Sequence, residues 1–460
     1  MTRLAPGLAA AKAVGALSRV AGRGGGTSLP GKVLTRLEPG AIGLLAGRLE
    51  RGSIVLSGTN GKTTTAAMIA SVLERRGARL VHNRAGANMA GGVASALASA
   101  ARGGGRRVDG DTGLFEVDEF WLAQMLSALE PRAVLLTNLF RDQLDRYGEL
   151  ETIGERWLEA ITRLPAATRL VLGADDPLVA DLGRHRDVLC FGVEDDALAR
   201  PEMQHAADSK HCRRCGHPYT YDAIYLGHLG RYRCPNCQAR RPDPAVRASD
   251  VELHGIRSAA FTLETADGTA RVELPLPGLY NVYNALAAAA LCTALEVTLA
   301  EIVTGLEAVE PVFGRAETLE VGSHPPRSMS LLLVKNPAGA NEVLRTLTLE
   351  PPGLDVLGVL NDGIADGRDV SWVWDADWEL IAPRLERMVC AGTRASELAV
   401  RLKYAGVDPA RLTVIEDLET ALGAALAGGE GPLYVLPTYT ALLELRELLA
   451  RRGEAQEYWR

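Results

Sequence analysis

Apolar residues along this chain follow two alternating patterns, short continuous runs and longer segments with helical spacing. In the first half the short runs are Ser53–Leu56, Val134–Thr137 and Leu170–Leu172, and each is typical of a buried strand. The segment from Thr63 to about Arg76 has helical spacing, and the Ala- and Leu-rich segment from Asn284 to about Leu295 predicts a buried helix. Strands that alternate with helices indicate an α/β protein with a parallel sheet.

A second α/β unit is expected after about residue 320. Its strand-like runs are Ser330–Val334, Val356–Leu360, Met388–Ala391 and Leu433–Leu436. Before it, residues 205–245 interrupt the rhythm with many polar residues and indicate an insertion, and alternating strands are expected near Val251–Leu276. The predicted division is an N-terminal leader or helical segment at 1–45, a central domain at 46–318 and a C-terminal α/β domain at 319–460.

The bulk composition is that of an ordinary soluble globular protein, with 47% hydrophobic and 23% charged residues. The formal net charge of −7 gives no global reason to expect a nucleic-acid partner. No apolar run reaches the roughly 18 residues that a membrane span needs. Residues 1–25 carry Arg3, Lys12, Arg19 and Arg23 without an acid. We expect this segment to form a first helix packed on its own domain, and a membrane-surface helix is the alternative.

The segment Ser57-Gly58-Thr59-Asn60-Gly61-Lys62-Thr63-Thr64 lies where the first strand gives way to the first helix of the central domain. Glycines at such a junction let backbone N–H groups face phosphate oxygens, and the helix N-terminus adds positive potential. Lys62 would reach the β- and γ-phosphates of a nucleotide, and the Thr63 hydroxyl would coordinate Mg²⁺. The sequence therefore predicts a site for ATP and Mg²⁺ at this loop.

This loop resembles the ATP loop of the Mur ligases and folylpolyglutamate synthetases, which form an acyl phosphate and then an amide. Phe115-Glu116-Val117-Asp118-Glu119 is similar to the family's second motif, which implies that Glu116 holds Mg²⁺. Asp118 and Glu119 stay open between a functional carboxylate and a solvated cap at the strand end. Leu136-Thr137-Asn138 through Asp142-Gln143-Leu144-Asp145 is similar to the family's TN…DHLD segment. Gln143 replaces the family's metal-binding histidine, so the resemblance leaves a second metal site undecided.

Three later motifs extend the resemblance. Pro277-Gly278-Leu279-Tyr280-Asn281-Val282-Tyr283-Asn284-Ala285 resembles the G-x-H-N-x-x-N-A segment, which implies that Asn281 contacts adenine. Phe313-Gly314-Arg315-Ala316-Glu317 resembles the PGR-x-E turn, which implies that Arg315 contacts the ATP phosphates. Lys335-Asn336-Pro337 stands where many members read HNP. The resemblance covers about 50–440 and implies a Mur-ligase-type central ATPase domain followed by a C-terminal α/β domain.

Four of the seven cysteines form a C-x₂-C-x₁₈-C-x₂-C pattern within the insertion. They are Cys212, Cys215, Cys234 and Cys237. Two such knuckles predict a zinc ribbon with a tetrahedral structural Zn²⁺ site, and four thiolates leave no open coordination position. The scattered Cys190, Cys292 and Cys390 are expected in the core, and an odd count with one cluster is typical of a reducing compartment.

The segment Leu360–Asp375 is rich in Asp, Gly and Trp and directly follows a predicted strand, a typical place for a site in an α/β fold. With the four-cysteine insertion and the leader Gly26–Gly31, it resembles the synthetase subunits of lipid II isoglutaminyl synthase, the MurT family. The resemblance runs nearly end to end. It implies that ATP activates the α-carboxyl of D-isoglutamate in the lipid II stem peptide, and that a GatD-type glutaminase partner in a heterodimer supplies ammonia.

The same resemblance implies that an aspartate of this loop helps the partner. A Cys/His glutaminase often needs a carboxylate to orient its histidine. The candidates are Asp362, Asp366 and Asp369, with a slight preference for Asp369. Trp372 and Trp374 are expected to anchor the loop by burial. We expect a cytoplasmic protein, and peripheral contact with the inner face of the membrane is kept as an alternative.

Two other functions fit parts of the sequence. The nearer alternative is a Mur-type peptide ligase or a folylpolyglutamate synthetase-like amino-acid ligase, families that usually lack the four-cysteine insertion. The other is a zinc-ribbon ATPase acting on nucleic acid, because six arginines lie in the insertion. They are Arg213, Arg214, Arg231, Arg233, Arg240 and Arg241. We interpret these arginines as the solvated face of a stabilised insertion and expect no nucleic-acid partner.

Overall fold

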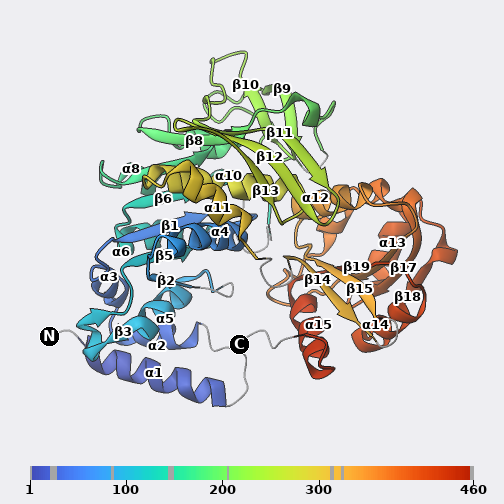
Figure 1. Cartoon of the computed structure of the whole chain (residues 1–460), viewed down its shortest axis with the longest axis horizontal. Helices are drawn as coiled ribbons and strands as arrows, with labels where there is room; N and C mark the ends of the chain where they lie inside the picture. The colour runs from blue at the N-terminus through green and yellow to red at the C-terminus, as the bar shows by residue number, and fades with distance from the viewer. Residues whose placement is uncertain are drawn as a thin grey trace.

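A computed structural model describes residues 3–20, 28–83, 87–142, 150–204, 207–310, 315–322 and 326–455, without the side chains of residues 19, 20, 315 and 316. The chain forms one large α/β body, which carries helices on both faces of its sheet, and a second α/β body toward the C-terminus (Figure 1). The domain bounds given above remain a prediction.

The first sheet has nine strands in the order β13-β12-β11-β8-β7-β6-β1-β5-β2. Their bounds are β1 Ser53–Ser57, β2 Leu80–His82, β5 Thr112–Glu116, β6 Ala133–Leu136, β7 Arg169–Gly173, β8 Val188–Val193, β11 Val246–His254, β12 Ser258–Thr265 and β13 Gly268–Leu274. Neighbours from β2 to β11 pair in parallel, and β11, β12 and β13 pair antiparallel. The predicted parallel α/β sheet is confirmed.

Helices bury both faces of this sheet, because successive residues of a strand point to opposite sides. Ile54 and Leu56 of β1 join a core with α4 (Lys62–Arg75), α10 (Leu279–Ala294) and α11 (Leu299–Glu307). Val55 joins the core on the other face. The helices there are α1 Leu4–Val20, α2 Leu29–Leu37, α3 Ala41–Ala46, α5 Ala90–Ala100, α6 Leu122–Leu129, α8 Leu150–Thr162 and α9 Pro177–Asp181. The alanine-rich α10 is buried, as predicted, but begins one turn earlier.

The first helix packs on its own domain. Leu4, Leu8 and Ala11 of α1 are buried in the same core as Leu34 of α2. Helix packing of this kind was the main expectation for residues 1–25, and the membrane-surface interpretation stays a prediction. Among the described residues, no helix is long and apolar enough to cross a membrane.

The expected insertion is a separate hairpin between β8 and β11. Its strands, β9 (Thr220–Leu226) and β10 (Leu229–Arg233), form their own two-stranded antiparallel sheet at the top of the view in Figure 1. Another short pair, β3 (Ala101–Arg102) and β4 (Arg107–Val108), follows α5. The cysteine pattern therefore lies on a hairpin that is added to the α/β core.

The second sheet has six strands in the order β14-β15-β19-β16-β17-β18. Their bounds are β14 Arg315–Val321, β15 Arg327–Leu332, β16 Leu354–Val359, β17 Leu385–Ala391, β18 Leu412–Val414 and β19 Leu433–Pro437. Apart from β14, which pairs antiparallel with β15, the strands run parallel. The helices are α12 Pro337–Thr348, α13 Ala395–Tyr404, α14 Leu418–Ala427 and α15 Tyr439–Arg451. All four strands expected after residue 320 are present.

Candidate functional site

The glycine loop turns sharply between β1 and α4, at the carboxyl edge of the first sheet. Gly61 has a left-handed φ of +85°, and a Cβ there would lie 1.9 Å from Asn284 Oδ1 of α10. A side chain is therefore excluded at this position. The loop borders a cavity of about 320 Å³, which is also lined by residues of the C-terminal body such as Lys335 and Tyr439. This arrangement leaves the N-terminus of α4 facing the cavity, as phosphate binding requires.

Lys62 lies inside this turn and is 7% exposed. Its Nζ donates to the backbone carbonyls of Gly58 and Thr59 and lies 3.0 Å from Glu119 Oε2. Burial alone would lower the pKa of Lys62, but the charges of Glu119 and its neighbouring acids outweigh burial and raise it. Burial would likewise raise the pKa of Glu119, and the charges of Lys62 and Lys335 lower it. Each of the two charges therefore favours the ionised form of the other group.

Three carboxylates line the cavity at the end of β5, namely those of Glu116, Asp118 and Glu119. Each is buried, and Glu116 is 2% exposed. The Thr63 Oγ1 atom is buried and has no hydrogen-bond partner. An unsatisfied hydroxyl beside carboxylates is the oxygen-rich donor set that Mg²⁺ prefers. The residues at this end of the cavity therefore fit a magnesium ion.

The C-terminal body contributes directly to the phosphate loop. Lys335 Nζ lies 2.6 Å from Asp142 Oδ2 and 3.4 Å from the Thr59 carbonyl oxygen. Asn336, the N-cap of α12, donates through Nδ2 to Asn60 Oδ1 at 2.9 Å. The motif comparison gave neither Lys335 nor Glu119 a role. A buried lysine such as Lys62 needs an anionic partner. One of the acids that follow Glu116 could therefore have been predicted from the sequence as that partner.

Asn281 also lies at the cavity, one turn into α10. Its Nδ2 donates to the Pro277 carbonyl at 2.8 Å, and its Oδ1 accepts from Asn284 Nδ2 at 3.0 Å. These bonds fix the amide's orientation next to the cavity. The Arg315 side chain and Gln143 lie outside the described residues, so their predicted roles stay predictions.

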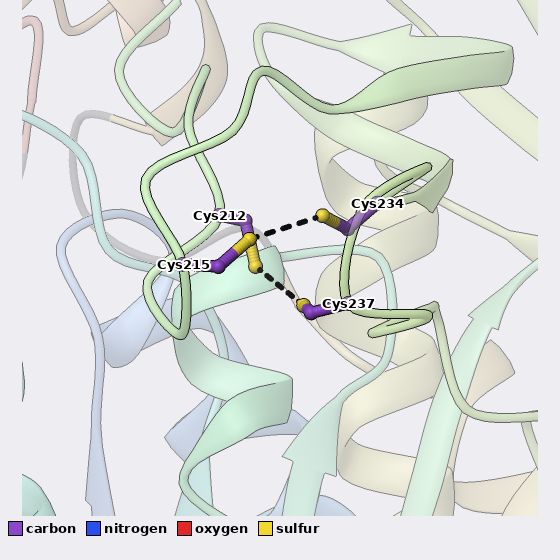
Figure 2. A group of neighbouring side chains, drawn as sticks. All are labelled: Cys212, Cys215, Cys234 and Cys237. Atoms are coloured by element: carbon purple, nitrogen blue, oxygen red, sulfur yellow. Dashed lines mark hydrogen bonds between the residues drawn. The ribbon is translucent and has the colours of Figure 1, made fainter.

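The four cysteines of the insertion converge on one point (Figure 2). Cys212 Sγ lies 3.4 Å from Cys237 Sγ, and Cys215 Sγ lies 3.5 Å from Cys234 Sγ. All four sulfur atoms lie within 4.8 Å of one another, the geometry of a four-thiolate metal site. The site is closed, because the two knuckles face each other and supply every ligand. These residues fit Zn²⁺ as a structural ion.

Three of the six arginines of the insertion, Arg214, Arg231 and Arg241, form ion pairs with acids outside the hairpin. Arg241 bonds Asp175 and Glu194, and Arg214 Nε lies 2.6 Å from Asp181 Oδ1. Arg231 also bonds Glu194. These ion pairs attach the hairpin to the sheet. The interpretation of all six arginines as solvated is therefore wrong for Arg241, whose side chain is 8% exposed.

The aspartates after β16 have different surroundings. Asp366 is 5% exposed and accepts from the Thr440 backbone N–H and hydroxyl. Asp362 accepts from Thr393 Oγ1 and Arg394 Nε, each at 2.8 Å. Asp369 is exposed and accepts from the Ser371 N–H at 2.8 Å. The bonds from Thr393 and Ser371 lower the pKa of Asp362 and of Asp369, respectively.

The predicted burial of the two tryptophans is wrong for Trp374, which is 49% exposed. Its ring lies under the Arg401 guanidinium at 5.7 Å and beside Tyr404. Trp372 is half-buried. Val373 and Trp378 are the buried anchors of this loop, and Trp378 Nε1 donates to the Val373 carbonyl at 3.1 Å. In the short 3₁₀ turn Ser371–Trp374, Val373 is the buried residue, which sequence spacing did not reveal.

Two sequence families match this chain in the order of its two bodies. The profile of the Mur ligase middle domain matches residues 56–241, which include the phosphate loop and the four cysteines. The profile of the MurT ligase C-terminal domain matches residues 333–442, which include Lys335 and the aspartate loop.

Full-length relatives show the same combination. The chain is 33% identical to the MurT subunit of the glutamine-hydrolysing lipid II isoglutaminyl synthase from Streptococcus pneumoniae strain R6, over 93% of each protein. It is 32% identical to the corresponding subunit from Staphylococcus aureus strain N315, over 95% of each protein. These two similarities cover both bodies of the fold.

Solved structures agree in fold. A pseudomurein peptide ligase type C from Methanothermus fervidus superposes with a TM-score of 0.67 at 24% identity, over 89% of this chain and 80% of that one. A MurF ligase from Thermotoga maritima, solved in complex with ADP, superposes with a TM-score of 0.64 at 15% identity, over 92% and 84% of the two chains. The predicted Mur-ligase architecture is confirmed.

Proposed function

This chain belongs to the MurT family of lipid II isoglutaminyl synthase subunits, and from that premise we propose how its cavity carries out the synthetase half of the reaction. The glutamine-hydrolysing synthase acts in peptidoglycan synthesis and is an ATP-dependent carbon–nitrogen ligase. In the proposed reaction, the substrate carboxylate is the α-carboxyl of D-isoglutamate in the stem peptide of lipid II. Ammonia is the nucleophile that provides the amide nitrogen.

The observation that carries this proposal is the position of Lys62. It lies buried at the end of the phosphate loop, in a cavity bordered by both bodies of the chain. Lys62 and Lys335 supply positive charge at this end, and Glu116 and Asp118 supply oxygen ligands. A site with both kinds of group can bind a nucleoside triphosphate and can position a substrate carboxylate beside the γ-phosphate.

Ammonia does not displace oxide from a carboxylate, because oxide is a poor leaving group. An oxygen of the carboxylate therefore first attacks the γ-phosphorus of ATP, and ADP leaves. Ammonia then attacks the carbonyl carbon of the acyl phosphate, phosphate leaves, and one proton is lost to give the amide. Lys62 stabilises the charge on the transferred phosphoryl group, and the backbone N–H groups at the start of α4 orient it.

Magnesium would be held by the Thr63 hydroxyl and by Glu116. When bound, it neutralises phosphate charge during phosphoryl transfer. Glu119 has a different role, since it already pairs with Lys62 at 3.0 Å and holds that ammonium in position. Asn281 is the proposed contact to adenine, and Arg315 the proposed contact to phosphate.

A glutaminase subunit of the GatD type is the proposed source of ammonia, and the loop after β16 is the proposed place of its catalytic support. An orienting carboxylate must be ionised and held in one direction. Asp366 is 5% exposed and accepts from Thr440 through both oxygens, so a partner's histidine cannot reach it, whereas the Asp362 side chain is 29% exposed. Asp362 is fixed by Thr393 and Arg394 at the end of a strand, whereas Asp369 bonds only its own turn among the described contacts. We therefore favour Asp362.

Reconstitution tests the proposal. The chain and its glutaminase partner are mixed with ATP, Mg²⁺, glutamine and lipid II, and amide formation is followed by mass spectrometry. Amidation that requires both subunits and ATP is expected. A second reaction omits the glutaminase and contains free amino acids instead, and it tests whether the chain has peptide-ligase activity. Amino-acid addition in the absence of a glutaminase would contradict the proposed function.

A further inference from the structure

Two leucines of the inserted hairpin reach the nucleotide cavity. Leu226 ends β9 and Leu229 begins β10, and the two residues pair across the turn. They are 5% and 3% exposed, and both line the cavity. The cavity wall there also includes Phe140 and Tyr280. The insertion is therefore part of the site, although its four cysteines lie at the other end of the hairpin.

The turn between these leucines is fixed by contacts with the first domain. Gly227 has a φ of +59°, and a Cβ there would lie 2.8 Å from Phe140 Cε1. The His228 side chain is fully buried, its Nε2 lies 3.3 Å from Asp176 Oδ2, and its ring centroid lies 4.5 Å from that of Phe140. These contacts of Gly227 and His228 hold the turn in a fixed position against Phe140.

The segment that holds the turn also holds the phosphate loop. The Phe140 N–H donates to Thr59 Oγ1 at 3.0 Å, and that hydroxyl faces the Phe140 carbonyl at 3.2 Å. Asp176 Oδ2 accepts from the Leu139 N–H at 2.7 Å. A displacement of the hairpin turn would therefore disturb Phe140, and with it the loop residue Thr59.

The four-cysteine cluster closes the opposite end of the hairpin. One knuckle precedes β9 and the other follows β10, so an ion bound by all four cysteines would join the two strands outside their backbone pairing. Between the cluster and the turn, the rings of Tyr219 and Tyr232 pack at 5.0 Å. Tyr221 Oη donates to the His228 carbonyl at 3.0 Å. Through these contacts, a change of strand register at the cysteines would also shift Leu226 and Leu229.

We propose that this hairpin forms the base-binding wall of the nucleotide site, with Leu226 and Leu229 packed against the purine of ATP and the metal-bound cysteines holding them in place. The phosphate end of the cavity is polar, since Lys62, Thr63 and Glu116 line it. Leu226, Leu229 and Phe140 add apolar side chains to the lining, and such side chains suit the flat faces of a base. His228 acts as a positioning residue for the turn. The inference rests on the proposed function in taking ATP as the ligand of this cavity.

The wall is tested by calorimetry, in which ATP is titrated into the complex of the chain and its glutaminase partner. Leu226→Ala and Leu229→Ala are each expected to raise the Kd for ATP about fivefold to tenfold, because apolar contact with the base is lost. Inorganic tripolyphosphate, which has no base, should bind the variants as it binds the natural chain. Ile224→Ala is the matched control, because Ile224 is a buried aliphatic residue of the same hairpin that does not line the cavity.

Unchanged ATP affinity in both leucine variants would overturn the assignment. Equal losses for ATP and tripolyphosphate would also overturn it, because the cavity as a whole would then have collapsed. ATP binding with the expected leucine dependence, but without amidation of lipid II, would contradict the proposed function and support the wall.

The metal and the turn are tested by the same titration. Removal of the metal by a chelator should raise the Kd for ATP at least about threefold, and added Zn²⁺ should restore it. His228→Ala should raise the KM for ATP more than it lowers kcat, and His228→Gln, which keeps a polar group toward Asp176, should recover part of the affinity. An ATP affinity that is indifferent to metal removal would refute the link between the cysteines and the wall.

Discussion

At the scale of single residues, Lys62 has the clearest consequence. Its ammonium is buried among backbone carbonyls and Glu119, and no other described lysine contacts Gly58. Lys62→Ala is expected to lower ATP-dependent amidation at least about a hundredfold, because transition-state charge on the phosphoryl group loses its partner. Circular dichroism should show an intact fold. Lys32→Ala, on the exposed surface of α2, is the control, and normal amidation by Lys62→Ala would refute the phosphate-loop assignment.

Substitutions of Glu116 and of Glu119 should lower the amidation rate in different ways. Glu116→Ala is expected to raise the Mg²⁺ concentration for half-maximal rate about tenfold, because a hard oxygen ligand is lost. Glu119→Gln should lower the rate even at saturating Mg²⁺, because Lys62 loses the anion that positions it. Initial rates across a Mg²⁺ series separate the two effects. Identical Mg²⁺ curves for the natural chain and Glu116→Ala would count against the metal role.

Asp362 is expected to act on the partner's reaction and not on the ligase reaction. Asp362→Asn in the complex should reduce glutamine-driven amidation at least about a hundredfold. Amidation driven by free ammonium should continue, since Lys62 and Glu116 are untouched. Asp369→Asn tests the other open candidate, and Asp408→Asn, an exposed turn cap of the same body, is the control. Loss of the ammonium-driven reaction in Asp362→Asn would assign this carboxylate to the ligase site.

At the scale of elements, we expect the stability of the hairpin to depend on a bound metal ion, because two short strands alone are marginally stable. One Zn²⁺ per chain is expected by elemental analysis. Cys215→Ser should remove it and lower the Tm by about 5 °C, because a closed structural site contributes folding free energy. Cys190→Ala, a buried cysteine outside the cluster, should keep the zinc. Freshly purified protein without zinc would contradict the assignment.

At the scale of the whole molecule, the cavity is complete only when the C-terminal body lies over the phosphate loop. The 2.6 Å contact between Lys335 and Asp142 joins the two bodies at that point. Lys335→Met and Asp142→Asn should each lower the amidation rate, by about tenfold for Lys335→Met, and the double variant should be no slower than Lys335→Met alone, because Asp142 acts through its contact with Lys335. Strictly additive losses in this double-mutant cycle would show that the two side chains act separately.

Several elements were predictable from the sequence because their signals are local. The buried run of β1, the glycine loop and the start of α4 follow within a few residues of one another, and the alanine-rich α10 has no polar face to expose. The four cysteines were also predictable, since their spacing encodes two knuckles. Trp374 was not, because in a short 3₁₀ turn the direction of each side chain depends on the helix packed beneath it.

The sequence by itself determined the parallel α/β core, the phosphate loop and the four-cysteine cluster, because each depends on periodicity or on short spacing along the chain. Only the tertiary structure decided which acid pairs with Lys62, that Lys335 reaches the loop, and that Leu226 and Leu229 border the nucleotide cavity. These contacts join residues that are far apart in sequence, such as Thr59 and Lys335. No local pattern specifies such pairs, since they follow from the packing of whole elements around one cavity.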